Sequence, residues 1–336
     1  MEQERPTLAI LDAVLRDGVC TSLEQALRQH GIPFLVHSIL RQDELTDRGF
    51  QGVPWLAKPA LPEDVVALLD ELAFLPPTPA PVAGAAPVRL VQPAESRGNP
   101  LVRKLEGFVT LSEADRAVLE RISANTRLLG PHVDLIHEGD TPDGVFLVME
   151  GIACRHKVRA NGARQIMAYL LPGDLGDVDV ALLKRMDHTI TTLSACRVVR
   201  VPTDTVAELV QNHPQIARAL RMSTLVDEAT LREWLVNVGR RSALERIAHL
   251  FCELLVRLQA VGLAEGRSYV LPISQLDLAD TTGLSNVHVN RSLQELRRRG
   301  LIEWKGRQLT ILDLPRLRTI AEFKSNYLHL GDRAAA

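Results

Sequence analysis

The chain has 336 residues, which is enough for two or three domains of roughly 100–200 residues each. Hydrophobic residues make up 46%, charged residues 24% and the net charge is −2, so the composition excludes the disordered and fibrous classes of protein. No apolar run approaches the ~20 residues of a membrane-spanning helix, and the opening residues lack a signal peptide, so we expect a cytoplasmic protein with no membrane partner.

Three short apolar runs alternate with helical patterns in the first 75 residues. The runs are LAIL at 8–11, IPFLVHSI at 32–39 and VPWLA at 53–57. This alternation is typical of a parallel sheet that is covered by helices. The pattern predicts a partial α/β segment over residues 1–75.

Polar residues at the ends of these runs resemble the second half of a two-component receiver domain. In that comparison Asp12 falls on the phosphoacceptor aspartate, Ser38 on the hydroxyl residue of the fourth strand, and Lys58 on the lysine after the fifth. The resemblance covers about residues 7–75, and it provides neither the first two strands nor the acidic pair that holds Mg²⁺. Without that metal the incoming phosphoryl group lacks its main charge stabiliser. We therefore expect a truncated receiver-like segment with a degenerate phosphoacceptor site.

Proline marks the next segment, since seven of the nineteen prolines fall in residues 76–100. The same stretch holds Ala, Gly and Ser but shows no apolar periodicity. This composition is typical of an extended linker.

Residues 101–213 are predicted to form an antiparallel β-roll. A helical opening with Ser112 as its N-cap is followed by turn signals at Gly139, Gly151, Gly162 and Gly173. The strand-like runs between and after these turns are GVFLVME at 144–150, IACRHKV at 152–158, RQIMAYLL at 164–171 and TITTLSACRVVRVP at 189–202. Short strands at this spacing favour a closed or double-sheet domain.

A long helix is predicted over residues 214–239, after a shorter helical pattern that breaks at Pro214. Leu231, Trp234, Leu235 and Val238 recur at helical spacing and form one apolar stripe. The stripe could pack within the chain, but we prefer a coiled-coil-like dimer seam, because a long helix between two domains has few other ways to bury it. We therefore expect a dimerisation helix here.

Residues 240–320 are predicted to form a winged helix-turn-helix domain, followed by a tail over 321–336. After an apolar helix, the pattern gives helices over 274–281 and 285–299, a turn at Gly283, and a hairpin near Lys305. Residues 241–320 carry 12 Lys and Arg against 8 Asp and Glu, whereas residues 1–100 carry 8 against 13. This excess of positive charge is what a nucleic-acid contact requires.

The second of these helices has the composition of a DNA recognition helix. Val289, Leu293 and Leu296 form its buried stripe, and polar residues lie off that stripe near the N-terminus. Arg reads guanine and Asn reads adenine through paired hydrogen bonds, while further cations contact phosphates. The residues that we assign to DNA are Ser285, Asn286, His288, Asn290, Arg291, Arg297, Arg298, Arg299, Lys305 and Arg307. The arginines at 297–299 could instead compensate the helix C-terminus as part of a solvated face.

The order of these parts, with the stretch LADTTGLSNVHVNRSLQELRRRGLI at 278–302, resembles the Crp-Fnr family of transcription regulators. The resemblance covers residues 101 to about 320. It implies an α+β multidomain chain with a cyclic-nucleotide-binding-like roll, a dimerisation helix and a winged helix-turn-helix. It also implies a homodimer that reads a two-fold symmetric site in double-stranded DNA and contacts RNA polymerase.

The family resemblance also supplies a test for the effector. Members that bind cyclic nucleotides carry a Gly-Glu pair and then an Arg-Ser pair, where this chain has Asp-Val at 177–178 and His-Thr at 188–189. The phosphate-binding arginine is absent, and Asp174, Asp177 and Asp179 are expected to cluster where an anion would sit. We therefore expect neither cyclic AMP nor another cofactor, and the roll is interpreted as a sensor or dimer support whose effector is unknown.

We expect no enzyme activity, because the sequence carries no nucleophile elbow, phosphate-binding loop, dinucleotide fingerprint or H-E-x-x-H motif. The four cysteines lie far apart without C-x-x-C spacing, so neither a disulfide framework nor a metal centre is predicted. The alternative interpretation is a phosphorelay or partner-binding protein that signals through residues 1–75. DNA binding itself discriminates between the two.

Overall fold

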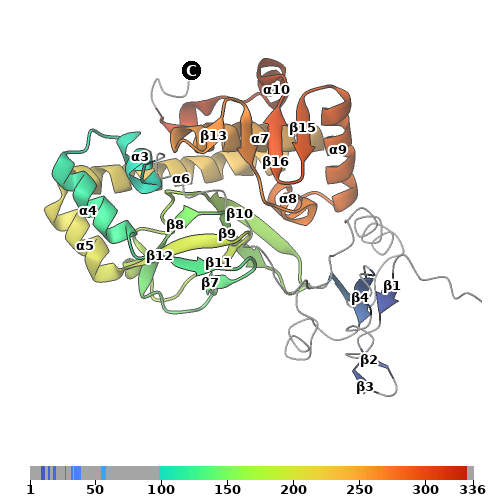
Figure 1. Ribbon diagram of the computed structural model, residues 1–336, viewed down its shortest axis with the longest axis horizontal. Coiled ribbons are helices and arrows are strands. Elements are labelled where there is room, and N and C mark those ends of the chain that lie inside the picture. Colours follow the sequence, from blue (N-terminus) through green and yellow to red (C-terminus); the bar gives the residue numbers. More distant parts are fainter. Residues whose placement is uncertain are drawn as a thin grey trace, which may run out of the picture. The chain divides into compact units, whose positions relative to one another are not determined.

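The computed structural model describes residues 98–330 and, before them, the short stretches 9–11, 14–15, 18–19, 27, 32, 34–38 and 54–57. The chain divides into two compact units, Met1–Pro93 and Ala94–Ala336. Most of the described elements are labelled in Figure 1.

The first unit contains a three-stranded parallel sheet. Strands β1 (Ala9–Leu11), β4 (Phe34–Ser38) and β5 (Trp55–Ala57) lie in the order β1-β4-β5, and both pairings are parallel. The three apolar runs therefore form the strands predicted for them. A short antiparallel pair, β2 (Val14–Leu15) with β3 (Gly18–Val19), was not anticipated.

The proposed phosphoacceptor site lies mostly outside this description. Asp12 and Lys58 are not among the described residues, and Ser38 is described only as the last residue of β4. The receiver-like character of the segment therefore stays a prediction. Residues 76–97 of the predicted linker also lie outside the described part of the chain.

The second unit opens with two capped helices, α3 (Pro100–Glu106) and α4 (Glu113–Ser123). The Ser112 side chain accepts a hydrogen bond from the Asp115 backbone N–H, and the Asp115 carboxylate accepts one from the Ser112 N–H. This reciprocal arrangement satisfies two helix N-terminal donors that would otherwise lack partners. The predicted N-cap is therefore confirmed.

A β-roll follows, built from two antiparallel sheets in the orders β10-β9-β11-β7 and β6-β12-β8. At one turn, glycine is required by both conformation and space: a Cβ on Gly151 (φ +84°) would lie 2.3 Å from the Ala195 carbonyl oxygen. The strands are β6 (Arg127–Leu129), β7 (Asp134–Ile136), β8 (Gly144–Glu150), β9 (Ala153–Val158), β10 (Arg164–Leu170), β11 (Thr189–Thr192) and β12 (Cys196–Pro202).

The run at 189–202, expected as one strand, is two strands in different sheets. Strand β11 pairs with β9 and β7, whereas β12 pairs with β6 and β8. At the crossing, the Thr192 hydroxyl donates to the Gly130 carbonyl at 2.8 Å, and the Ser194 hydroxyl accepts from the Ile152 N–H at 3.0 Å. Between β11 and β12, hydrogen bonds from side chains to the backbone replace the strand-to-strand hydrogen bonds. The pattern of apolar residues does not reveal such a change, so it did not predict where the first strand ends.

Two helices connect the roll to the rest of the unit. Helix α5 (Thr203–Asn212) ends just before Pro214, and α6 (Pro214–Arg240) begins with that proline at its first turn. In Figure 1, α6 runs between the strands of the roll and helix α7, and it contacts both β10 and α7. Among the described helices, none is both long and apolar enough to cross a membrane.

The predicted apolar stripe of α6 is divided between two environments. Trp234 is 5% exposed and lies edge-on to Tyr169 at 5.7 Å between ring centroids, whereas Leu235 is 75% exposed. Leu231 is also exposed. The four stripe residues span about 100° of the helix circumference, and the core of the chain covers only one edge of that arc. The expectation of a single shared face is therefore wrong.

The C-terminal part of the unit is a helix-turn-helix with a sheet on one side. The expected hairpin belongs to a four-stranded sheet in the order β13-β14-β16-β15. Phe323, Tyr327 and Leu328 of the expected tail are buried in the same core. The elements are α7 (Ala243–Ala260), β13 (Ala264–Glu265), β14 (Ser268–Val270), α8 (Gln275–Thr282), α9 (Asn286–Arg298), β15 (Ile302–Lys305), β16 (Gln308–Ile311), α10 (Leu314–Ala321), and the 3-10 turns η2 (Val180–Leu182) in the roll and η3 (Ser325–Leu328).

Candidate functional site

The turn between α8 and α9 depends on one glycine. Gly283 adopts a left-handed conformation with φ +65° and ψ +31°, and its N–H donates to the Ala279 carbonyl. The next residue, Leu284, donates to the same carbonyl at 3.1 Å. Because a residue with a Cβ is strained at this φ, the glycine allows α8 to stop and α9 to leave in a new direction. The turn predicted from the sequence is confirmed.

The buried stripe fixes which face of α9 points outward. Val289, Leu293 and Leu296 are all buried, as predicted, and they pack into the core formed around α7. The N-terminus of α9 is capped by Ser285, whose hydroxyl accepts from the His288 N–H at 3.4 Å. That hydroxyl also lies 2.9 Å from His288 Nδ1. Two of the proposed DNA-binding side chains therefore contact each other at the start of the helix.

Four of the proposed DNA-binding residues extend freely from this face. Asn286, Asn290, Arg291 and Arg297 are exposed, and the two arginines take part in no ion pair within residues 98–330. Their donors are therefore available to an external partner. Amide and guanidinium groups at the outward face of a recognition helix are suited to paired hydrogen bonds with base edges.

The other predicted cations are partly neutralised within the chain. Glu295 accepts from Arg298 at 2.7 and 2.8 Å and from Arg299 at 2.7 Å, and these bonds lower the pKa of Glu295 to about 2. Lys305 pairs with Glu303 at 2.6 Å, while Arg307 is exposed. The 297–299 cluster thus presents one unpaired guanidinium rather than three.

Two outward-facing residues were missed by the sequence prediction. Val287 and Gln294 are both exposed, and at 100° per residue they lie within about 20° of each other, on the side opposite the buried stripe. The prediction selected polar residues near the helix N-terminus and so passed over Val287. A helical projection of residues 286–298 would have identified both.

The helix-turn-helix is joined to the roll by charged contacts. Arg164 on β10 donates to Asp280 at 2.7 Å and to Asp277 at 2.5 Å, both on α8. On the same strand, Tyr169 Oη lies 2.5 Å from Thr281 Oγ1. Because the roll contacts the first helix of the turn directly, the position of α8 depends on the position of β10.

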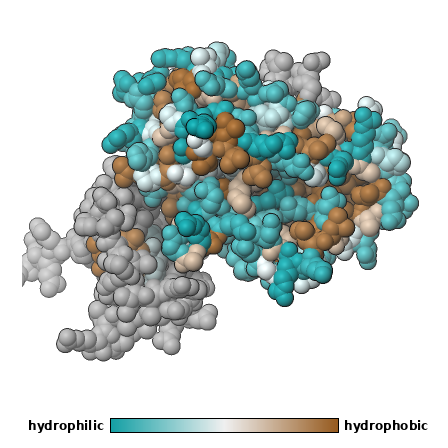
Figure 2. Space-filling model, turned by 180° about the vertical axis from the view of Figure 1, so that it is seen from behind, coloured by the Kyte–Doolittle hydropathy of each residue, from teal (hydrophilic) through white to brown (hydrophobic). Residues whose placement is uncertain are grey.

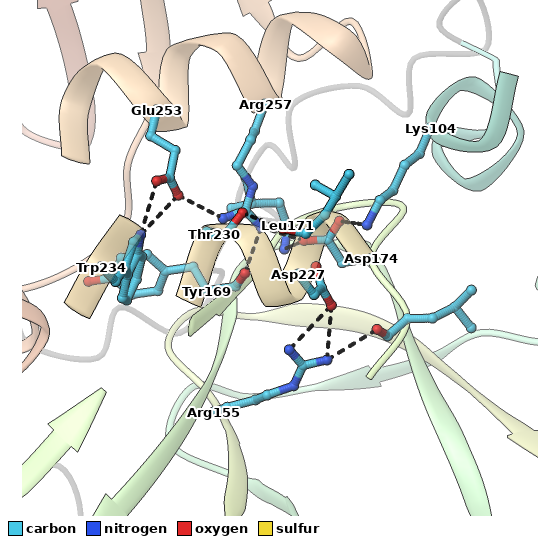
Figure 3. A network of polar contacts seen from close by, with 12 residues as sticks. Lys104, Arg155, Tyr169, Leu171, Asp174, Asp227, Thr230, Trp234, Glu253 and Arg257 are labelled. Atoms are coloured by element: carbon cyan, nitrogen blue, oxygen red, sulfur yellow. Dashed lines mark hydrogen bonds and ion pairs between the residues drawn. The ribbon is translucent and has the colours of Figure 1, made fainter. Parts of the chain in front are cut away.

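A buried network extends this junction (Figure 3). Asp174, after β10, accepts from Lys104 at 2.6 Å and from Arg257 at 2.8 Å. Arg257 also bonds to Glu253 at 3.2 Å, and Glu253 accepts from the Trp234 indole N–H at 3.0 Å. Burial raises the pKa of Glu253. The network connects α3, the roll, α6 and α7, with buried carboxylates at Asp174 and Glu253 and partly buried cations at Lys104 and Arg257.

The residues that align with the ligand-binding pairs of cyclic-nucleotide-binding members form an internal ion-pair cluster. Asp177 Oδ2 lies 3.0 Å from His188 Nε2, and Asp177 Oδ1 lies 3.5 Å from Arg155 Nε. Arg155 also contacts Asp227 of α6 at 3.4 Å. Burial alone would raise the pKa of Asp177, but the His188 and Arg155 interactions outweigh it and lower that pKa.

Two of the three acids expected to cluster here are paired with cations of the chain itself. Asp174 is turned toward Lys104 and Arg257, while Asp177 is turned toward His188 and Arg155. The sequence placed the carboxylates but could not place the distant cations that neutralise them. Within the described residues, no group of three or more His, Cys, Asp or Glu side chains is arranged to hold a metal ion.

Two family models match the chain. Residues 245–320 match the Crp-like helix-turn-helix domain, and residues 127–213 match the cyclic nucleotide-binding domain. The first match contains the whole α8–turn–α9 unit, and the second contains all seven strands of the roll.

Similar proteins are found among curated regulators and solved structures. The transcriptional activator protein FnrL of Cereibacter sphaeroides is 32% identical over 54% of this chain and 75% of its own length. The transcriptional activatory protein AadR of Rhodopseudomonas palustris is 29% identical over 66% of this chain and 90% of its own. The structure of FixK2 from Bradyrhizobium japonicum shares the fold, with a TM-score of 0.53 at 24% identity over 58% of this chain and 96% of that one. The chain therefore belongs to the Crp-Fnr family of transcription regulators.

Proposed function

We propose that the chain acts as a homodimer that reads a two-fold symmetric DNA operator, with α9 of each subunit in the major groove of one half-site. The observation that carries this proposal is the outward face of α9. Its buried stripe anchors the helix, while Asn286, Asn290 and Arg291 remain exposed at the end that a recognition helix inserts into the groove. Arg297 and Arg307 are assigned to phosphates, which position the protein without specifying sequence.

The exposed side of α6 supports the homodimer. Leu225, Leu231, Leu235 and Val236 are all exposed on this 27-residue helix. On the face drawn in Figure 2, hydrophobic and hydrophilic side chains of the second unit are interspersed, so exposed apolar groups as such are not unusual. Their recurrence along one helix is the relevant feature, because pairing two such helices removes this apolar surface from water.

The roll is proposed to work without cyclic AMP. In place of a phosphate-binding arginine, His188 contacts the Asp177 carboxylate at 3.0 Å. A cyclic phosphate at this position would have to displace that carboxylate or lie beside its charge. We assign the roll a sensor or dimer-support role whose effector is unknown. Contact with RNA polymerase is proposed because FnrL and AadR are both described as activators of transcription.

Selection of duplexes from a random pool by the full-length protein tests this function. We expect enrichment of an inverted repeat whose half-site centres lie about 10 base pairs, or one helical turn, apart. Light scattering of the bound complex should give two subunits per duplex. Enrichment of an asymmetric sequence would contradict the two-fold arrangement. A pool without any enriched sequence would overturn the proposed function as a whole.

A further inference from the structure

An apolar side chain lies at the centre of the proposed DNA-reading face. Val287 is the second residue of α9, and its side chain is 55% exposed. Viewed down the helix axis, Val287 lies on average about 150° from the buried residues Val289, Leu293 and Leu296. Val287 therefore points away from the core, and its neighbours on this face, Asn290 and Arg291, are both polar.

The chemistry of this side chain limits what it can recognise. Valine neither donates nor accepts a hydrogen bond, and a β-branched residue is a poorer helix former than alanine. Helix stability therefore does not explain a valine at this exposed position. In the major groove, each base pair presents donors and acceptors, and only the A·T pair adds an apolar group, the thymine 5-methyl.

We propose that Val287 is a specificity-determining residue that contacts the 5-methyl group of one thymine in each half-site. This inference rests on the proposed function, in which α9 enters the major groove. Val287 and Arg291 are four residues apart on the same side of α9, which separates them by about 6 Å along the helix axis. The thymine is accordingly expected within about two base pairs of the base that Arg291 contacts.

Replacement of thymine by uracil tests the contact directly. Uracil keeps the pairing and the O4 acceptor and lacks only the methyl group. In the operator selected by the full-length protein, each thymine is replaced in turn by uracil in both half-sites, and the dissociation constant is measured by fluorescence anisotropy. We expect one symmetric pair of thymines whose replacement weakens binding about fourfold for each methyl lost.

The variant Val287→Ala assigns the effect to the side chain. Alanine favours a helix, so α9 should remain folded, and the thermal midpoint of the variant checks this. We expect Val287→Ala to bind the thymine and uracil operators equally. The matched control is Val158→Ala on β9, which truncates a valine of similar exposure, 54%, in the roll and should retain the full uracil effect.

The outcomes separate this inference from the function on which it rests. An enriched operator that binds equally well with uracil at every position would overturn the thymine contact alone. The same conclusion follows if Val287→Ala keeps the uracil effect. A pool without any enriched sequence would overturn the proposed function and this inference together.

Discussion

The His188 imidazole lies between two carboxylates in the roll. Its Nε2 is 3.0 Å from Asp177 and its Nδ1 is 2.7 Å from Asp187. Burial on its own would lower the pKa of His188, but the bonds to Asp177 and Asp187 outweigh it and raise that pKa. Because the folded state holds the proton more tightly than the unfolded state, protonated His188 stabilises the fold.

The pH dependence of stability tests this arrangement. The contribution of His188 is fully present below its ordinary pKa of 6.5 and is lost as the pH rises through the raised value. We expect the free energy of unfolding, measured in urea, to fall more steeply between about pH 6 and pH 9 in the parent protein than in His188→Gln. The exposed histidine variant His137→Gln should keep the parent slope. Parallel curves for the parent and His188→Gln would contradict the ion-pair cluster.

At the scale of single residues, the sequence predicted caps, turns and helix faces better than it predicted which residues pair with one another. Ser285, Gly283 and the stripe of α9 could be assigned from local spacing alone, because caps, turns and helix faces depend on near neighbours. Arg298 and Arg299 were assigned to DNA from the sequence, yet both form ion pairs with Glu295. Asp174 shows the long-range case, since its partner Arg257 is 83 residues away and no local pattern encodes that contact.

Helix α6 has one side packed against the core and another that is exposed. Trp234 faces the core, where its indole donates to Glu253, while Leu235, about 100° further around the helix, is largely exposed. The sequence placed both residues in one stripe, because apolar periodicity does not reveal how much of a helix the chain itself covers. For the same reason, the apolar run at 189–202 did not reveal that it is shared between two sheets.

A charged residue on the exposed side of α6 should therefore affect assembly more than folding. We expect Leu235→Glu to shift the protein from dimer to monomer at micromolar concentration, because the new carboxylate would be buried without a partner in the seam. Multi-angle light scattering measures the mass. Leu128→Glu on β6, which is also an exposed leucine, should remain dimeric. A dimeric Leu235→Glu would place the seam elsewhere.

At the scale of the whole molecule, the roll and the helix-turn-helix form one described unit, held together in part by the network around Arg257. That guanidinium bonds to Asp174 and Glu253, both of which are buried. The network is costly to bury and more costly to break, because removing Arg257 leaves the buried Glu253 without a cation and Asp174 with Lys104 alone. The direct contact between the roll and α8 is made separately, by Arg164 with Asp277 and Asp280.

The variant Arg257→Ala tests the strength of this junction. We expect a loss of about 3–5 kcal/mol in the free energy of unfolding, because Asp174 and Glu253 lose a buried cation together. Urea denaturation of the full chain measures it. The control is Arg232→Ala, which breaks an exposed ion pair on α6 and should change stability little. Equal stabilities for the two variants would show that the junction contributes nothing.

The N-terminal face of α9 is proposed to read base sequence, and the affinity ratio between a selected operator and a scrambled duplex tests this role most directly. We expect Arg291→Ala to reduce this ratio by about tenfold or more, since a bidentate base contact contributes roughly 1–3 kcal/mol of discrimination. Its binding to the scrambled duplex should keep nearly the parent salt dependence, as expected for the loss of a base contact. An Arg291→Ala protein with the parent ratio would contradict the assignment of α9 as the recognition helix.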